Sequence, residues 1–137
     1  MASQSKRLAR QKGRQLTGRF AAIPLTVLDS KAYAALSWQA RALLMELAAQ
    51  FNGQNNGDLA AAHALHKARG WHRSTLQAAT EELDRAGFIV RTRHGNRKRC
   101  NLYAVTWRAI DPCPGKDLDT GHPIGGAPLK LWEKNSI

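Results

Sequence analysis

The side chains best suited to bind a ligand lie in residues 73–78, at the start of an expected helix. The contact candidates there are Arg73, Ser74, Thr75, Gln77 and Ala78. An arginine guanidinium matches the O6 and N7 acceptors of guanine, and a glutamine amide matches N6 and N7 of adenine. The free backbone N–H groups of a helix N-terminus also attract phosphate. These residues therefore predict contact with a nucleic acid.

A local explanation of the same residues stays open. Ser74 and Gln77 have the spacing of a capping box, in which each side chain satisfies a backbone N–H group of the other residue. Arg73 would then be a solvated surface charge. Capping by Ser74 and contact of its hydroxyl with phosphate are compatible.

A second group of cations follows the helix. Residues 88–93 and 101–107 are rich in β-branched and aromatic residues and flank a turn at Gly95-Asn96, so they predict a β-hairpin. Its cations are Arg91, Arg93, Arg97, Lys98 and Arg99. Such a hairpin can lie along a phosphate backbone or insert an arginine into the minor groove. Charged hairpins also avoid edge-to-edge pairing, but five cations within residues 91–99 exceed that need.

The net charge of +11 is concentrated in two segments of the chain. Residues 1–19 and residues 87–108 each carry +6 with no acidic residue, whereas residues 28–86 are neutral and residues 109–137 carry −1. This distribution predicts a polyanionic partner. In the N-terminal arm the DNA-contact candidates are Arg7, Arg10 and Arg14. The alternatives are that the charge serves solubility and that the arm is simply disordered.

Several other functions find no support in the sequence. His63 and His66 lie one turn apart without a third ligand, and Cys100 and Cys113 match no metal or redox spacing, so we expect no metal and no cofactor. We find no nucleophile–base pair and no phosphate-binding loop, so we expect no enzyme. With no signal peptide or membrane-length apolar run, we expect a soluble protein of the cytoplasm, associated with the nucleoid.

The sequence predicts a flexible basic arm at residues 1–19, a folded domain at 20–110 and an extended Pro/Gly-rich tail at 111–137. Expected helices are 31–36 capped by Ser30, 38–51 capped by Ser37 and ended by Asn52-Gly53, 58–69 capped by Asp58, and 74–86. Pairing of Leu59 with the later hairpin is the alternative for the third of these. The expected core positions on these helices are Ala40, Leu43, Leu44, Leu47, Ala48, Phe51, Leu59, Ala62, Leu65, Leu76, Ala79, Leu83 and Ala86; Trp38, Trp71 and Trp107 are expected to be core or staple residues.

The resulting fold class is α+β, mainly α, and its three helices followed by a basic hairpin resemble the winged helix-turn-helix superfamily of DNA-binding proteins. More narrowly, residues 20–113 resemble small helix-turn-helix proteins of proteobacterial prophages and other mobile elements. The matching pattern is Ala22-Ile23-Pro24, Leu28-Asp29-Ser30, Leu36-Ser37, Gln39-Ala40-Arg41-Ala42-Leu43, Asn52-Gly53, Asn55-Asn56-Gly57-Asp58-Leu59, Arg69-Gly70-Trp71, Glu82-Leu83, Gly87-Phe88-Ile89-Val90-Arg91-Thr92-Arg93, Thr106-Trp107 and Asp111. One departure is the short corner at residues 70–74, which leaves the start of the recognition helix open by one or two residues.

The resemblance implies this fold and a DNA-binding role. Our hypothesis is a sequence-specific double-stranded DNA-binding protein that regulates transcription in a phage or other mobile element. Three alternatives remain: a replication-initiation or plasmid-maintenance factor, an RNA-binding protein, and a protein-interaction adaptor. A homodimer is possible, with the tail at Leu129–Trp132 or the early Ala-rich helix as its interface.

Overall fold

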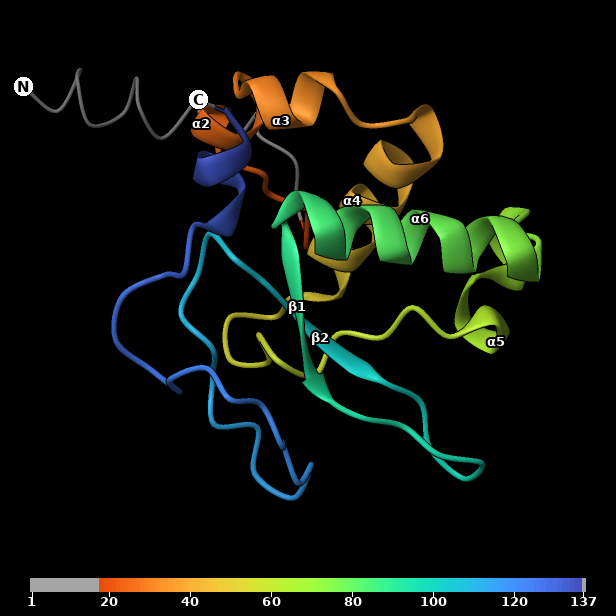
Figure 1. Cartoon of the computed structure of the whole chain (residues 1–137). Helices are drawn as coiled ribbons and strands as arrows, with labels where there is room; N and C mark the ends of the chain where they lie inside the picture. The colour runs from red at the N-terminus through yellow and green to blue at the C-terminus, as the bar shows by residue number, and fades with distance from the viewer. Residues whose placement is uncertain (1–17, 137) are drawn as a thin grey trace, which may run out of the picture.

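The computed structural model describes residues 18–136, which form an α+β, mainly helical structure with a two-stranded antiparallel hairpin (Figure 1). The order of elements is α2 (Leu25–Leu28), α3 (Lys31–Ala34), α4 (Trp38–Gln50), α5 (His63–His66), the 3₁₀ helix η1 (Lys67–Arg69), α6 (Arg73–Ala86), β1 (Ile89–Arg93), β2 (Leu102–Val105) and the 3₁₀ helix η2 (Leu131–Ser136). Within residues 18–136, no helix is both long and apolar enough to cross a membrane.

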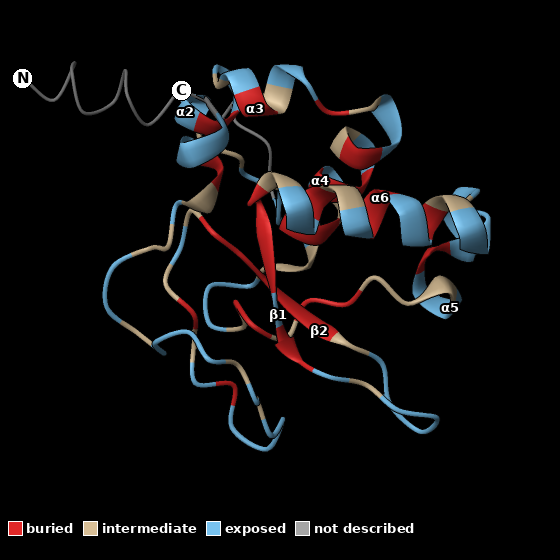
Figure 2. Ribbon diagram, in the orientation of Figure 1, coloured by how far each residue is buried: buried red, intermediate tan, exposed pale blue. Residues whose placement is uncertain are grey.

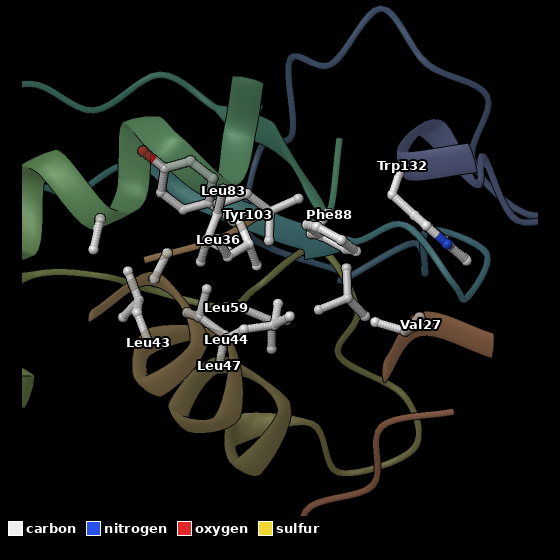
Figure 3. Packing of buried hydrophobic residues seen from close by; sticks show 14 of the residues in the cluster. Val27, Leu36, Leu43, Leu44, Leu47, Leu59, Leu83, Phe88, Tyr103 and Trp132 are labelled. Carbon is white, nitrogen blue, oxygen red and sulfur yellow. The ribbon is translucent and has the colours of Figure 1, made fainter. Parts of the chain in front are cut away.

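The core lies between α4, α6 and the hairpin. Figure 2 shows both strands buried along most of their length, and Figure 3 shows the leucines of α4 beneath Leu83 of α6 and Phe88. The predicted core positions Leu43, Leu44 and Leu47 are fully buried. Burial of a leucine side chain contributes roughly 1.5–3 kcal/mol, so this contact is the main constraint on the position of α6.

The helix α4 begins as predicted, at the Ser37 cap. The Ser37 Oγ accepts a hydrogen bond from the Ala40 N–H at 3.1 Å and donates one to the Glu82 carboxylate of α6 at 2.7 Å. One serine thus caps α4 and ties it to α6. The end of α4 differs from the prediction: Phe51 leaves the helix in an extended conformation, and the left-handed residue is Gly53 rather than the helix cap itself.

The predicted helix at residues 58–69 is wrong in its first half, and the alternative pairing of Leu59 is confirmed. The Leu59 backbone exchanges hydrogen bonds with Tyr103 of β2, at 3.1 and 2.7 Å. The Gln50 side-chain amide bonds both backbone groups of Ala60, at 2.7 and 2.8 Å. These bonds hold the chain extended up to Ala62, so only α5 and η1 form. Leu65, expected inside, is 59% exposed.

The helix α6 begins at Arg73, not at Ser74. His72 is the N-cap residue, and no side chain caps the helix. The predicted capping box between Ser74 and Gln77 is therefore wrong. The Gln77 amide instead lies 3.4 Å from the Glu81 carboxylate, one turn further along the helix.

The hairpin is confirmed close to its predicted bounds, but its pairing contains an irregularity. Arg91 pairs with Tyr103 and Arg93 with Leu102, which leaves Thr92 as an extra residue. This bulge interrupts the alternation of side chains between the two faces of the strand, so that both Thr92 and Arg93 are buried. The loop that follows turns back at Gly95, where a Cβ atom would lie 2.6 Å from the Arg99 carbonyl oxygen.

The C-terminal segment folds back on the body of the molecule. The Trp132 ring is buried and stacks on Phe88 with 6.0 Å between centroids, so this residue anchors the end of the chain to the core. Gly87 is required here, because a Cβ atom would lie 2.6 Å from the Leu131 carbonyl carbon.

The fully buried side chain of Asn56 links the loop before Leu59 to the end of β2 and the residues after it. Its Nδ2 donates to the carbonyl oxygens of Val105, Arg108 and Ala109, and its Oδ1 accepts from the Val105 N–H.

Candidate nucleic-acid interface

The predicted contact residues of α6 form an outward face on its first two turns. Arg73, Ser74, Gln77 and Ala78 are exposed, and Thr75 is half-buried. Leu76 and Ala79 point to the core and fix the rotation of the helix. Because no side chain caps this end, the partial positive charge of the helix and its first N–H groups face outward.

The start of α6 is positioned by hydrogen bonds to Trp71. The Trp71 Nε1–H donates to the Glu46 carboxylate at 2.6 Å, and the Trp71 carbonyl oxygen lies 2.9 Å from the His63 Nε2. The other Glu46 oxygen lies 2.7 Å from His66 Nδ1, and His66 Nε2 lies 2.9 Å from the Ala60 carbonyl oxygen. We term Glu46, His63, His66 and Trp71 the Trp71 clamp. It ties α4 and α5 to the residue that precedes α6.

Sequence reasoning missed this clamp. His66 is buried. The one available signal was the one-turn spacing of the two histidines, but they have different partners, the Trp71 carbonyl oxygen for His63 and Glu46 for His66. Glu46 lies 20 residues before His66 and has no local marker.

The hairpin loop, residues 94–101, presents cations to solvent. Arg97, Lys98 and Arg99 are all exposed. The Asn96 side-chain oxygen accepts from the backbone N–H groups of Lys98 and Arg99, at 2.8 and 3.2 Å, so the loop backbone is ordered beneath these side chains. The Arg99 guanidinium lies 3.6 Å from the Asp117 carboxylate, an exposed and therefore weak pair.

The two arginines of β1 have different surroundings. Arg91 is exposed, and its guanidinium donates to His94 Nε2 at 2.7 Å. Arg93 is buried and donates to the carbonyl oxygens of Lys116, at 3.2 Å, and Cys100, at 2.9 Å. The structure therefore gives Arg93 an internal role instead of the predicted DNA contact, because the bulge at Thr92 turns it inward.

A hollow of about 430 Å³ separates α6 from the hairpin. Arg73 and Gln77 line it from α6, and Arg91 and Tyr103 line it from the hairpin. Burial raises the pKa of the Tyr103 phenol above its ordinary value, so the hydroxyl stays a proton donor at neutral pH. Further along α6, Glu81 and Asp84 also line the hollow and make that end unfavourable for phosphate.

The segment after the hairpin places the Asp119 carboxylate beside His94, at the start of the hairpin loop. The His94 backbone N–H donates to the Asp119 carboxylate at 3.1 Å, and His94 Nδ1 lies 3.0 Å from it. Hydrogen bonds from the His94 side chain and backbone hold the pKa of the Asp119 carboxyl below its ordinary value. The Asp119 backbone N–H donates to the Thr92 carbonyl oxygen at 2.8 Å, so Asp119 lies beside β1.

The other predicted residues have varied surroundings. Arg7, Arg10 and Arg14 lie outside the described residues. Trp38, expected in the core, is 78% exposed, with the Arg41 guanidinium 4.6 Å from its ring centroid. Trp71 and Trp107 are half-buried and pack against the core, as expected.

The cysteines and acidic residues provide no metal site in the part of the chain that the structure describes, since no group of three His, Cys, Asp or Glu side chains is suitably arranged within residues 18–136. Cys100 is exposed, and burial raises the pKa of the Cys113 thiol. Comparison of the chain with protein-family models, curated proteins and solved structures gives no match.

Proposed function

We propose that this chain is a winged helix-turn-helix protein that binds double-stranded DNA and reads its sequence through α6. The observation that carries the proposal is the hollow between the first turns of α6 and the hairpin, with Arg73 and Gln77 on one wall and Arg91 on the other. Arg97, Lys98 and Arg99 are exposed on the loop of the same hairpin.

The order of elements supports this assignment. A long helix, α4, is followed by the Leu59 bridge, the short α5, the helix α6 and then the hairpin. In a helix-turn-helix the second helix of the pair enters the major groove and the first crosses the backbone. We assign α6 to the first role and α5 to the second, with the hairpin as the wing.

In this arrangement the contacts divide into two kinds. Arg73, Ser74, Thr75, Gln77 and Ala78 face base edges and the nearest phosphate, and each good bidentate pair discriminates bases by about 1–3 kcal/mol. Arg91, Arg97, Lys98 and Arg99 contact the sugar–phosphate backbone, which supplies affinity without sequence information. Glu81 and Asp84 limit the footprint to the N-terminal half of α6.

The biological role we propose is transcriptional regulation in a phage or other mobile element, which rests on the sequence resemblance of residues 20–113 and not on the geometry. A replication-initiation factor would use the same surface, and the genomic location of the bound sites separates the two.

The test is selection of bound fragments from a random duplex pool with the full chain. Arg73→Ala is compared with Arg85→Ala, which removes the same charge from the exposed C-terminal end of the same helix. We expect a defined motif that Arg73→Ala degrades at one or two positions and Arg85→Ala leaves unchanged. An absence of enrichment from the duplex pool, or a preference for structured RNA in competition, would contradict the proposal.

A further inference from the structure

The outer face of α4 carries an apolar stripe that the described residues leave uncovered. The stripe consists of Trp38, Ala42, Met45 and Ala49, all exposed and spaced by four, three and four residues. This is the spacing of one helix face. The opposite face, with Leu43, Leu44 and Leu47, is fully buried in the core. Both faces of α4 are therefore apolar, although only one packs against this chain.

The stripe is the part of α4 on which large apolar side chains meet water. Trp38 is 78% exposed and Met45 is 49% exposed. Exposed apolar side chains that stand singly need no explanation, but a row of them on a helix is typical of an interaction surface.

The surfaces expected earlier for a homodimer are partly occupied within the chain, although Ala34 and Ala35 of the early Ala-rich helix stay exposed. Trp132 stacks on Phe88 in the core, and Leu129 and Leu131 pack against Val90, Ala104 and Ile110. In α3, Ala32 is buried. The α4 stripe is thus the better candidate for contact with another molecule.

Large and small side chains alternate along the stripe, and this pattern is complementary to its own reverse. When a second copy of α4 lies antiparallel about a two-fold axis between Ala42 and Met45, Trp38 of each copy faces Ala49 of the other. In the same register Ala42 faces Met45. A parallel arrangement would instead place Trp38 on Trp38 and Met45 on Met45. Only the antiparallel register lets the two helices approach closely, because each large side chain meets an alanine.

The surface beside Ala42 is already hollow. A depression is lined by Trp38, Ala42, Trp71 and the turn that contains Gly70 and His72. In the antiparallel register this depression receives the Met45 side chain of the second copy. A thioether against aromatic rings is a favourable contact, so the shape and chemistry of the depression suit the residue that the register brings to it.

The stripe itself is uncharged, which contact with a second copy of this cationic chain requires. The chain carries a net charge of +11, and two copies repel each other wherever their cations meet. None of the four stripe residues is charged, and no basic side chain lines the depression apart from the ionisable ring of His72. The one cation of α4, Arg41, lies beside the stripe, with its guanidinium 4.6 Å from the Trp38 ring centroid.

We propose that α4 pairs antiparallel with α4 of a second copy, with Trp38 against Ala49 and Ala42 against Met45, to form a two-fold homodimer. The contact rests on one helix and a neighbouring turn, so it is smaller than the roughly 800 Å² per partner of a standard interface. The dimer is correspondingly weak, with a Kd between about 1 μM and 1 mM.

Sedimentation equilibrium of the full chain without nucleic acid tests the pairing, so its result is independent of DNA binding. We expect a concentration-dependent monomer–dimer equilibrium below about 1 mM. Ala42→Glu and Met45→Lys each abolish it, because each places two unpaired charges, one from each copy, in the apolar contact. The double change A42E/M45K restores it, because each glutamate then faces a lysine of the other copy.

The matched control is Ile124→Lys. Ile124 has the same 49% exposure as Met45 but lies in the C-terminal segment, so this change leaves dimerisation intact. Circular dichroism confirms that each variant keeps its helices. The proposal is overturned by a monomer at every concentration, by a dimer that survives both single changes, by equal loss in Ile124→Lys, or by a double variant that stays monomeric, which excludes the antiparallel register.

Discussion

The two sides of the hairpin use similar residues in opposite ways. Arg91 is exposed and lines the hollow beside α6, and Arg97, Lys98 and Arg99 are exposed on the hairpin loop. Arg93, in contrast, is buried against backbone carbonyls, and the Asp119 N–H donates to the Thr92 carbonyl oxygen of β1 while its carboxylate contacts His94. The formal charge of a segment thus differs from the charge that a ligand can reach. Arg91, the exposed arginine of β1, lies across the hollow from α6, which is where the proposed DNA contact needs a cation.

The largest difference between the two sides is expected in stability. Arg93→Met keeps most of the side-chain volume but leaves the Cys100 and Lys116 carbonyl oxygens without their donor. Loss of hydrogen bonds from a buried charged group lowers the free energy of unfolding by about 2–4 kcal/mol. Urea denaturation measures this. Arg97→Ala changes it by less than about 0.5 kcal/mol, and an equal effect of the two changes would remove the distinction between the sides.

The Trp71 clamp sharpens the comparison, because it positions the start of α6 through residues that are not among the proposed DNA contacts. Of its members, His63 also lines the hollow beside α6. Glu46→Leu keeps a similar side-chain size but leaves the Trp71 Nε1–H without its acceptor and His66 Nδ1 without its partner. We expect a loss of about 1–3 kcal/mol in the free energy of unfolding. Binding would lose base discrimination while its salt dependence stays unchanged. Unaltered discrimination among selected duplexes would show that the clamp does not position α6.

The reactivity of the two cysteines compares the exposed hairpin loop, which contains Cys100, with the buried part of the C-terminal segment, which contains Cys113. Cys100 lies exposed at the end of the hairpin loop, whereas Cys113 is buried and its raised pKa reduces the thiolate fraction at neutral pH. If an opening of about 1.4 kcal/mol or more is needed to expose Cys113, iodoacetamide modifies Cys100 at least about tenfold faster. Mass spectrometry of labelled peptides gives both rates, and similar rates would contradict the burial of the C-terminal segment.

The smallest effect is expected from pH. The pKa of Asp119 is lowered, so the folded form favours its carboxylate. Its contribution to holding the segment beside β1 is complete above the ordinary aspartate pKa of about 3.9 and is lost as the pH falls through the lowered value. NMR titration should find the Asp119 pKa below about 3.9, and Asp119→Asn should make the segment insensitive to pH in that range. A pKa at or above 3.9 would contradict the His94 contact.

The sequence predicted those features that depend on neighbouring residues. Ser30 and Ser37 cap helices because a serine hydroxyl reaches N–H groups three residues on, and the hairpin was evident from its residue types and turn. Contacts between distant segments were not predictable in this way. The pairing of Leu59 with Tyr103 replaces a helix that local pattern favoured.

The candidate site shows the same limit. The exposed face at Arg73 and Gln77 follows from helix periodicity and was predicted correctly as a surface. Strand alternation places Arg91 and Arg93 on the same side, but the bulge at Thr92 separates them. Trp38 shows the converse, since its size and neighbours favoured the core, whereas the leucines on the other face of α4 already fill it.

The central claim is that reachable cations of the hairpin, rather than total charge, bind the DNA backbone. The direct test measures affinity for a selected duplex against salt concentration for the unchanged chain, for R97A/K98A/R99A, and for K31A/R85A/K134A, which removes three exposed cations elsewhere. Each phosphate contact contributes about −0.9 to the slope of log K against log salt. We expect the first triple change to reduce the magnitude of the slope by about 2.7 and the second to leave it unchanged. Equal reductions in both would mean that charge alone drives binding, and would contradict the account.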